Sequence, residues 1–299
     1  MTEQLQETEK RAWTILDLLN WGTDYLAGRK FDNPRLNVEL LLAAALGCGR
    51  VQLYTNFDKP LSPSELSTFK KLFERRLAHE PIQYIRGETE FLSHRFLLTR
   101  DVLIPRPETE ILVEKVIEQC KQKCQDRRVI KILDFGTGCG NIAISIANHV
   151  ENAEVIGFDI SENAIAVAQK NLGLHGLKGR VKFAVLDLFA PLEEGFRAKV
   201  EMVVSNPPYI SKQEFDRLMP EVREYEPRIA TCDEDDGFRF HRRIADLAKA
   251  LLAPGGWLFL EVGFNQAKDV REILQQRGLK NMDTFTDYAG IERVMQAQR

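Results

Sequence analysis

The sequence predicts a small bundle of helices followed by an α/β domain, in which helices cover both faces of a mostly parallel sheet. Two observations carry this prediction. Apolar residues recur with a helical period before residue 87, whereas short β-rich runs alternate with helix-like segments after residue 108. A glycine-rich loop also joins the first β-rich run to its helix, as in a nucleotide-binding βα unit. A chain of 299 residues is long for one domain and suits two.

The helical domain is expected at residues 1–87. Helical periodicity appears in three segments, at residues 7–29, 34–47 and 62–79. The first segment repeats apolar side chains on one face at Trp13, Leu16, Leu19 and Leu26. Ser62 and Glu65 give the last segment a capping-box start. Such helices bury their apolar stripes against one another. The bundle either only stabilises the chain or docks a protein substrate.

A β-hairpin connector is expected at residues 88–105 and the α/β domain at residues 106–299. Short strands at residues 90–92 and 96–98 leave His94 at the hairpin turn, with no function attached to it. The strands expected in the sheet are residues 129–133, 153–158, 181–186, 200–205, 256–262, 278–286 and 291–297.

The glycine loop Asp134-Phe135-Gly136-Thr137-Gly138-Cys139-Gly140 follows the first of these strands and leads into a helix-like segment. Its glycines let the backbone pass close to a ligand and adopt φ values that other residues resist. The spacing G-x-G-x-G matches neither the dinucleotide pattern G-x-G-x-x-G nor a phosphate loop ending in Gly-Lys-Ser/Thr. The loop therefore predicts a nucleotide-like ligand without a pyrophosphate cradle.

Acidic residues end the next two strands. A carboxylate at Asp159 can accept hydrogen bonds from two ribose hydroxyls. An Asp there is also common as a helix N-cap, a role that Ser161 can share. Asp187 and Leu188 are suitably placed for the edge and the face of an adenine ring.

The motif Asn206-Pro207-Pro208-Tyr209 follows the apolar strand 200–205. Its side-chain carbonyl, backbone carbonyls and aromatic ring together can hold a planar amino group by both hydrogens and by its flat surface. The two prolines stiffen the motif, because each fixes its own φ and restricts the residue before it. The alternative is an ordinary turn at a strand end, since Asn-Pro pairs mark turns.

These motifs resemble the class I S-adenosylmethionine-dependent methyltransferases, and the Asn-Pro-Pro-Tyr motif resembles members that methylate an amide or exocyclic amino nitrogen. Three further segments narrow the resemblance: Ile104-Pro105-Arg106-Pro107-Glu108-Thr109-Glu110, Pro81-Ile82-Gln83-Tyr84-Ile85-Arg86-Gly87 and Tyr225-Glu226-Pro227-Arg228. With these, the chain from about Pro81 to its end is similar to the release-factor glutamine methyltransferases, the HemK or PrmC family.

The resemblance implies a seven-stranded Rossmann-like domain whose last two strands form an antiparallel pair, and S-adenosylmethionine as cofactor. The cofactor would contact Gly136, Thr137, Gly138, Cys139, Gly140, Asp159, Asp187, Leu188 and Asn206. The substrate would contact Asn206, Pro207, Pro208, Tyr209 and Leu103, with Asn206, Pro207 and Tyr209 catalytic. The substrate implied is the glutamine of the Gly-Gly-Gln tripeptide in the peptide-chain release factors of translation termination.

Some positions depart from the sequence that is usual in this family. Cys139 stands where a small hydroxyl residue is common, and Leu188 where an aromatic residue often stacks on adenine. Residues 229–237 replace an Ala-Leu pair and a glycine-rich turn. The acidic run within them, residues 233–236, is more typical of a solvated loop and lacks the distal Glu of a calcium loop.

Other acidic residues keep two interpretations each. Glu108 and Glu110 either position the substrate loop or favour the first turn of a helix through its dipole. Glu226 either orients the Asn-Pro-Pro-Tyr motif or pairs with Arg223 or Arg228. Glu261, at a strand end, is interpreted as structural.

Composition favours a cytoplasmic enzyme. Residues 1–10 lack the pattern of a signal peptide, and the apolar run 40–46 is too short to span a bilayer. Five dispersed cysteines predict no disulfide framework, and Cys120 with Cys124 does not complete a zinc site. The net charge of −3 and the absence of a basic stripe argue against direct nucleic-acid binding. We therefore expect a protein without metal, away from membranes. We also expect a monomer.

Three rival interpretations remain open. A glutamine methyltransferase acting on a ribosomal protein shares the Asn-Pro-Pro-Tyr motif but usually departs from the string at residues 104–110. An adenine-amino DNA or RNA methyltransferase would carry basic surface or a target-recognition domain. A non-catalytic binding module on the same scaffold is the third, because fold does not guarantee function.

Overall fold

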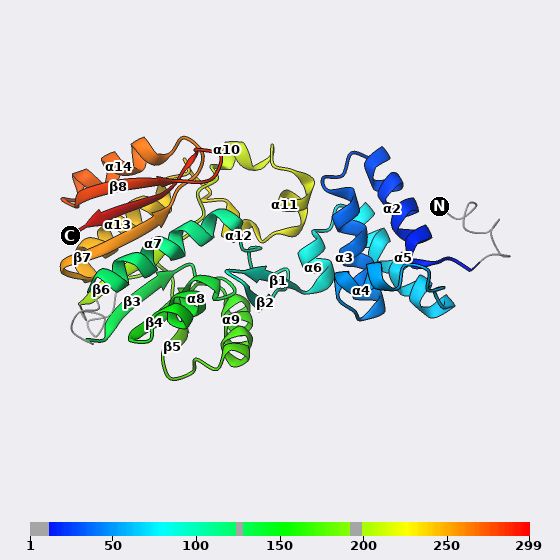
Figure 1. Cartoon of the computed structure of the whole chain (residues 1–299). Helices are drawn as coiled ribbons and strands as arrows, with labels where there is room; N and C mark the ends of the chain where they lie inside the picture. The colour runs from blue at the N-terminus through cyan, green and yellow to red at the C-terminus, as the bar shows by residue number, and fades with distance from the viewer. Residues whose placement is uncertain (1–11, 124–127, 192–198) are drawn as a thin grey trace. The chain divides into compact units, whose positions relative to one another are not determined.

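Two units make up the chain, one ending at Gly87 and the other beginning at Glu88 (Figure 1). The computed structural model describes residues 12–123, 128–191 and 199–299. Each unit has its own hydrophobic core, since the buried cluster of the first contains no residue beyond Ile85 and the two clusters of the second contain none before Phe91. The architecture confirms the predicted fold class of a helical bundle, a hairpin and a Rossmann-like domain.

The first unit consists of helices α2 (Ile15–Gly28), α3 (Pro34–Leu46), α4 (Arg50–Thr55), α5 (Pro63–Leu77) and α6 (Ile82–Arg86). Capping boxes start α2 at Thr14 and α5 at Ser62, the second as predicted. The two short helices α4 and α6 were not expected from periodicity, because neither has enough residues to show a repeat.

The first helix differs in two ways from its prediction. It begins at Ile15, and the expected start at residue 7 lies outside the described residues. Leu19 and Leu26 are fully buried as predicted, but Leu16 is 39% exposed and Trp13 precedes the helix. The buried face of the helix is therefore not the predicted one. It consists of Ile15, Leu18, Leu19, Gly22 and Leu26.

The second unit opens with the hairpin of β1 (Glu88–Phe91) and β2 (His94–Leu97), which pair antiparallel. Leu92 and Ser93 form the turn with left-handed φ values of 47° and 61°. His94 was expected in the turn, but it begins β2, because Phe91 pairs with His94 and leaves only two residues between the strands. Phe91 and Phe96 are buried in the core.

A seven-stranded sheet forms the centre of the second unit, in the order β5-β4-β3-β6-β7-β9-β8. Its strands are β3 (Ile130–Phe135), β4 (Ala153–Asp159), β5 (Val181–Val185), β6 (Val200–Ser205), β7 (Leu252–Glu261), β8 (Lys280–Thr286) and β9 (Glu292–Gln298). All neighbouring pairs are parallel except β7 with β9 and β8 with β9, so the expected antiparallel pair at the end of the chain is confirmed.

Helices cover both faces of this sheet (Figure 1). One face packs against α7 (Pro107–Lys123), α8 (Asn141–His149) and α9 (Glu162–His175). The other packs against α13 (Arg239–Leu251) and α14 (Ala267–Gln276). Neighbouring residues of one strand serve opposite faces, as Met202 and Val203 do in β6. Three short helices connect β6 to α13: α10 (Lys212–Phe215), α11 (Pro220–Tyr225) and α12 (Arg228–Thr231).

Among the helices of the described ranges, none is both long and apolar enough to cross a membrane. Within the same ranges, Cys48, Cys120, Cys139 and Cys232 are free thiols. Cys124, which the sequence placed on one helix face with Cys120, lies outside the described residues.

Candidate functional site

A cavity of about 580 Å³ opens at the carboxyl ends of the central strands. β3 lies between β4 and β6, so successive connections leave it in opposite directions, and ligands of open α/β sheets bind at such a point. Residues from the ends of all four strands from β3 to β6 line the cavity, including Phe135, Asp159, Leu186 and Ser205. Its volume is within the range of about 300–1,000 Å³ that is usual for small-molecule sites.

The glycine loop contributes Gly136 and Gly138 to the cavity wall. Both have left-handed φ values, 72° and 53°, which only glycine adopts without strain. Gly140 instead packs inward, where a Cβ atom would lie 2.7 Å from Cζ of Phe183. The loop is fixed to the neighbouring strand because the N–H groups of Gly136 and Thr137 both donate to the carbonyl of Phe158.

Two loop residues expected to touch a cofactor lie under the loop rather than along the cavity. Thr137 is buried, and its hydroxyl donates to the carboxylate of Asp134 at 2.6 Å. Cys139 is 1% exposed, and burial raises the pKa of its thiol to about 12, so it stays protonated and unreactive. These side chains hold the shape of the loop.

Asp159 ends β4 and lines the cavity. One carboxylate oxygen accepts from the N–H of Gly138 at 2.9 Å and the other from the N–H of Ser161 at 3.0 Å. Burial raises the pKa of Asp159, and these backbone donors oppose the rise. The side chain of Ser161 caps α9 through the N–H of Ala164. The N-cap role that the sequence left open therefore belongs to Ser161.

Residues that follow β5 give the cavity an apolar wall. Leu188 and Phe189 line the cavity together with Phe240, whose ring meets that of Phe189 edge-on at 5.2 Å. The guanidinium of Arg239 lies 4.3 Å from the centre of the Phe189 ring. Asp187 also lines the cavity and accepts from the N–H of Phe189 at 2.8 Å. The sequence pointed to Asp187 and Leu188 but missed Phe189, Phe240 and Arg239.

The Asn-Pro-Pro-Tyr motif supplies a further part of the cavity wall. Asn206, Pro207 and Pro208 line it, as does Leu103 from the segment before α7. Tyr209 is not among the lining residues, because its hydroxyl turns to the carboxylate of Glu261 at 3.3 Å. Burial raises the pKa of that hydroxyl. The amide nitrogen of Asn206 donates to the hydroxyl of Thr109 at 3.1 Å.

An ion pair joins the segment before α7 to the segment after α11: Arg106 contacts Glu226 at 2.6 Å. Of the two interpretations of Glu226, the pairing with Arg223 or Arg228 is wrong, because those two arginines pair with Glu224 and Glu234. The difference arises because α11 and α12 point those arginines outward, where their partners are exposed side chains of neighbouring residues.

Glu108 and Glu110 both lie in the first turn of α7, as one of their two interpretations required. Glu110 also accepts from the N–H of Leu92 at 2.7 Å. It therefore ties the hairpin turn to the start of the helix.

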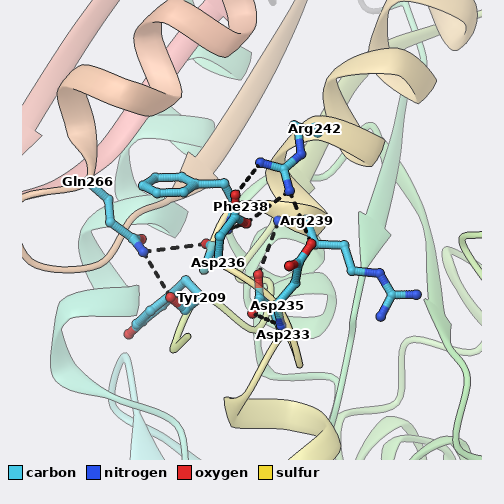
Figure 2. Close-up of polar contacts among 9 residues, drawn as sticks. Tyr209, Asp233, Asp235, Asp236, Phe238, Arg239, Arg242 and Gln266 are labelled. Carbon is cyan, nitrogen blue, oxygen red and sulfur yellow. Dashed lines mark hydrogen bonds and ion pairs between the residues drawn. The ribbon is translucent and has the colours of Figure 1, made fainter. Parts of the chain in front are cut away.

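Hydrogen bonds to backbone N–H groups hold the acidic loop at residues 233–236 in place (Figure 2). Asp233 is 1% exposed, and its two carboxylate oxygens accept from the N–H groups of Asp235 and Arg239. Cys232 forms a parallel bridge with Ile210, directly after the Asn-Pro-Pro-Tyr motif. Gln266 donates to the carbonyl of Tyr209 at 2.9 Å and so holds the same segment from the other side. Across the described ranges no cluster of acidic, His or Cys residues could hold a metal ion.

Comparison with known proteins gives matches over both units. The family model described as the PrmC N-terminal domain matches residues 17–87, and the one described as the methyltransferase small domain matches residues 108–222. A release factor glutamine methyltransferase of Geobacter sulfurreducens is 43% identical over 289 residues, covering 96% of this chain and 98% of the relative. One of Chlorobaculum tepidum is 38% identical over 287 residues, covering 95% and 97%.

Among solved structures, the hMettl16 catalytic domain in complex with the MAT2A 3'UTR hairpin 6 is similar, with a TM-score of 0.50. It is 13% identical to this chain, and the match covers 74% of this chain and 91% of that one. A likeness at this identity concerns the fold alone.

Proposed function

The chain belongs to the release factor glutamine methyltransferases, and from this membership we propose how its residues perform the reaction. The enzyme transfers a methyl group from S-adenosylmethionine to the side-chain amide nitrogen of a glutamine in a release factor. We assign that glutamine to the Gly-Gly-Gln tripeptide of the release factor.

The cavity at the strand ends fits S-adenosylmethionine. Asp159 presents a carboxylate in the cavity, where it accepts from the ribose hydroxyls. Gly136 and Gly138 let the ligand approach the backbone, and Leu188 with Phe189 offers an apolar surface to the adenine ring. Asp187 accepts from the edge of that ring. When bound, S-adenosylmethionine supplies an electrophilic methyl group on a positively charged sulfur.

Asn206 and Pro207 hold the acceptor nitrogen. An amide nitrogen is a weak nucleophile, because its lone pair is delocalised into the carbonyl. The side-chain oxygen of Asn206 and the carbonyl oxygen of Pro207 accept the two amide hydrogens, which fixes the plane of the amide and directs the nitrogen's π lone pair out of that plane. Positioning of this kind contributes about 7–11 kcal/mol in favourable systems. That both residues line one cavity carries the proposal.

The same two acceptors also stabilise the transition state. Positive charge grows on the nitrogen as it takes the methyl group, and preorganised oxygens aimed at that charge lower the barrier. The methylated amide cation is strongly acidic, so water takes its proton and no protein base is needed.

The remaining contacts of the substrate amide are assigned to two residues. Leu103 lines the cavity and provides an apolar wall for the amide. Stacking of the amide on the ring of Tyr209 stays a prediction, and it requires the ring to turn toward the cavity from its contact with Glu261.

Other proposals concern the whole enzyme. Residues 1–87 recognise the folded release factor, residues 88–105 connect, and residues 106–299 perform the transfer. The enzyme acts as a monomer in the cytoplasm, where release factors work, and it contacts neither nucleic acid nor membrane directly.

Mass spectrometry of a release factor incubated with the enzyme and S-adenosylmethionine tests the proposed substrate. We expect one added methyl group on the peptide that contains Gly-Gly-Gln, located at the glutamine. A release factor whose Gly-Gly-Gln glutamine is replaced by alanine should gain none. A methyl group at another residue, or on a ribosomal protein instead, would contradict the assignment.

A further inference from the structure

We propose that Thr109 and Glu261 are positioning residues that orient the amide of Asn206, so that its oxygen rather than its nitrogen faces the substrate. The inference rests on the proposed role of Asn206 as an acceptor and adds what makes that role possible. Neither residue lines the cavity, so both act through Asn206.

A chain of two hydrogen bonds connects the three side chains. The amide nitrogen of Asn206 donates to Oγ1 of Thr109 at 3.1 Å, and that hydroxyl donates to Oε2 of Glu261 at 2.6 Å. Thr109 and Glu261 are each 1% exposed. Because water is excluded from both, these hydrogen bonds have no solvent competitor.

The sheet brings these residues together although they are far apart in the sequence. β6 and β7 are parallel neighbours, and Ser205 pairs with Leu260. The next residues along the two strands, Asn206 and Glu261, therefore lie side by side at this edge of the sheet. Thr109 reaches both from the first turn of α7, 97 residues before Asn206 and 152 before Glu261.

The donor and acceptor in each of these two hydrogen bonds follow from the number of protons that the side chains can donate. A threonine hydroxyl has one proton to donate and two lone pairs that accept. An ionised Glu261 can only accept a hydrogen bond, so the Thr109 hydroxyl donates its single proton to that bond. Toward Asn206 the hydroxyl can then only accept, which selects the NH2 end of the amide. The oxygen of Asn206 is left for the hydrogen of the substrate amide.

The surroundings of Glu261 keep its carboxylate in place. Its second oxygen accepts from the hydroxyl of Tyr209 at 3.3 Å, and its backbone carbonyl accepts from Nε2 of His241 at 3.0 Å. The charged groups that act on it are Glu108 on α7 and Arg293 on β9. Arg293 is itself paired with Asp287 at 2.9 Å.

Protonation of Glu261 removes the constraint on Asn206. Burial raises the pKa of Glu261 to about 7, and the hydrogen bonds from Thr109 and Tyr209 oppose the rise. A protonated Glu261 can donate to Thr109, whose own proton is then free for the oxygen of Asn206. The amide would turn its NH2 group to the substrate, where two donors would face each other. Activity should therefore fall as the pH drops through this pKa.

Kinetics of the full-length enzyme with a release factor and S-adenosylmethionine test the proposal. Thr109→Val, which has the shape of threonine without the hydroxyl, should lower kcat about 10- to 100-fold, as loss of a supporting hydrogen bond does at other sites, and leave KM unchanged. Thr109→Ser should restore most of the activity. Thr284→Val is the matched control, because Thr284 donates to Glu292 at 2.7 Å at an exposed position on β8.

A double-mutant cycle separates positioning from stability. If Thr109 acts only through Asn206, adding Thr109→Val to Asn206→Ala should change kcat less than about 2-fold. An equal loss in both backgrounds would overturn the proposal, as would a Thr109→Val enzyme that melts lower but turns over normally. If Asn206→Ala alone were fully active, the proposed function of Asn206 would fail instead.

The pH profile of the wild-type enzyme tests the proposal without any substitution. For the wild type we expect log kcat to decline below about pH 7, and for Glu261→Gln we expect a lower kcat without that decline, because a neutral amide can both donate and accept. A wild-type profile that is flat between pH 6 and 8, or a Glu261→Gln profile that keeps the same decline, would contradict the proposal.

Discussion

Replacing Asp159 by alanine should weaken binding of S-adenosylmethionine by about one to three decades. Hydrogen bonds to a charged group contribute about 1.5–3 kcal/mol each, and the carboxylate offers two of them to the ribose. Water that enters the vacated space recovers part of the loss. The structure adds a second effect: the carboxylate also accepts from the N–H of Gly138, so its removal takes away one of the hydrogen bonds that hold the glycine loop to β4.

Titration calorimetry with S-adenosylmethionine measures this loss directly. Asp287→Ala is a suitable control, because Asp287 also accepts from two backbone N–H groups, those of Ala289 and Ile291, in a turn outside the cavity. Its affinity should equal that of the wild type, and a chelator should change neither. An Asp159→Ala enzyme that binds as tightly as the wild type would refute the assignment of the ribose to Asp159.

Three further outcomes are expected. A chain of residues 88–299 should bind S-adenosylmethionine normally but fail to methylate an intact release factor, and unchanged turnover by this fragment would exclude a recognition role for residues 1–87. Gly157→Ala should lower the free energy of unfolding in urea by about 1–3 kcal/mol, because its Cβ would lie 2.5 Å from Oγ1 of Thr137, whereas Gly179→Ala, with nothing within 4 Å, should not. Burial raises the pKa of Glu261 from 4.5 to about 7, so the folded protein holds this proton more tightly than the unfolded chain. The protonated side chain should therefore contribute roughly 3 kcal/mol to the free energy of unfolding below pH 4.5, and this contribution should be lost as the pH rises through 7. Urea melts of Glu261→Gln should lack that loss.

Local sequence patterns predicted the elements of the second unit well. Strand β6 was predicted with its observed ends, and the glycine loop and Asp159 lie at strand ends as expected. These predictions succeed because apolar periodicity and glycine positions are properties of a few consecutive residues. The position of Leu16 in α2 failed for the same reason, since a stripe of apolar residues does not say which of two adjacent faces meets the core.

Partners of polar side chains could not be predicted in this way. Glu226 pairs with Arg106, 120 residues away, rather than with either neighbouring arginine. Glu261, interpreted as structural, accepts from Thr109 because α7 packs against β7, and it lies beside Asn206 because β6 and β7 are adjacent in the sheet. Phe189 and Phe240 meet at the cavity through the packing of α13. Strand order and register decide such contacts, and a single sequence does not contain them explicitly.

The central claim is that Asn206 holds the acceptor nitrogen by its side-chain oxygen. The most direct test is the single-turnover rate constant for methylation of a release factor by Asn206→Ala, measured on enzyme whose thermal melt matches the wild type. We predict a rate constant lower by about 10²–10³, the usual effect of removing one preorganised electrostatic partner. A folded Asn206→Ala enzyme that transfers the methyl group at the wild-type rate would contradict the claim.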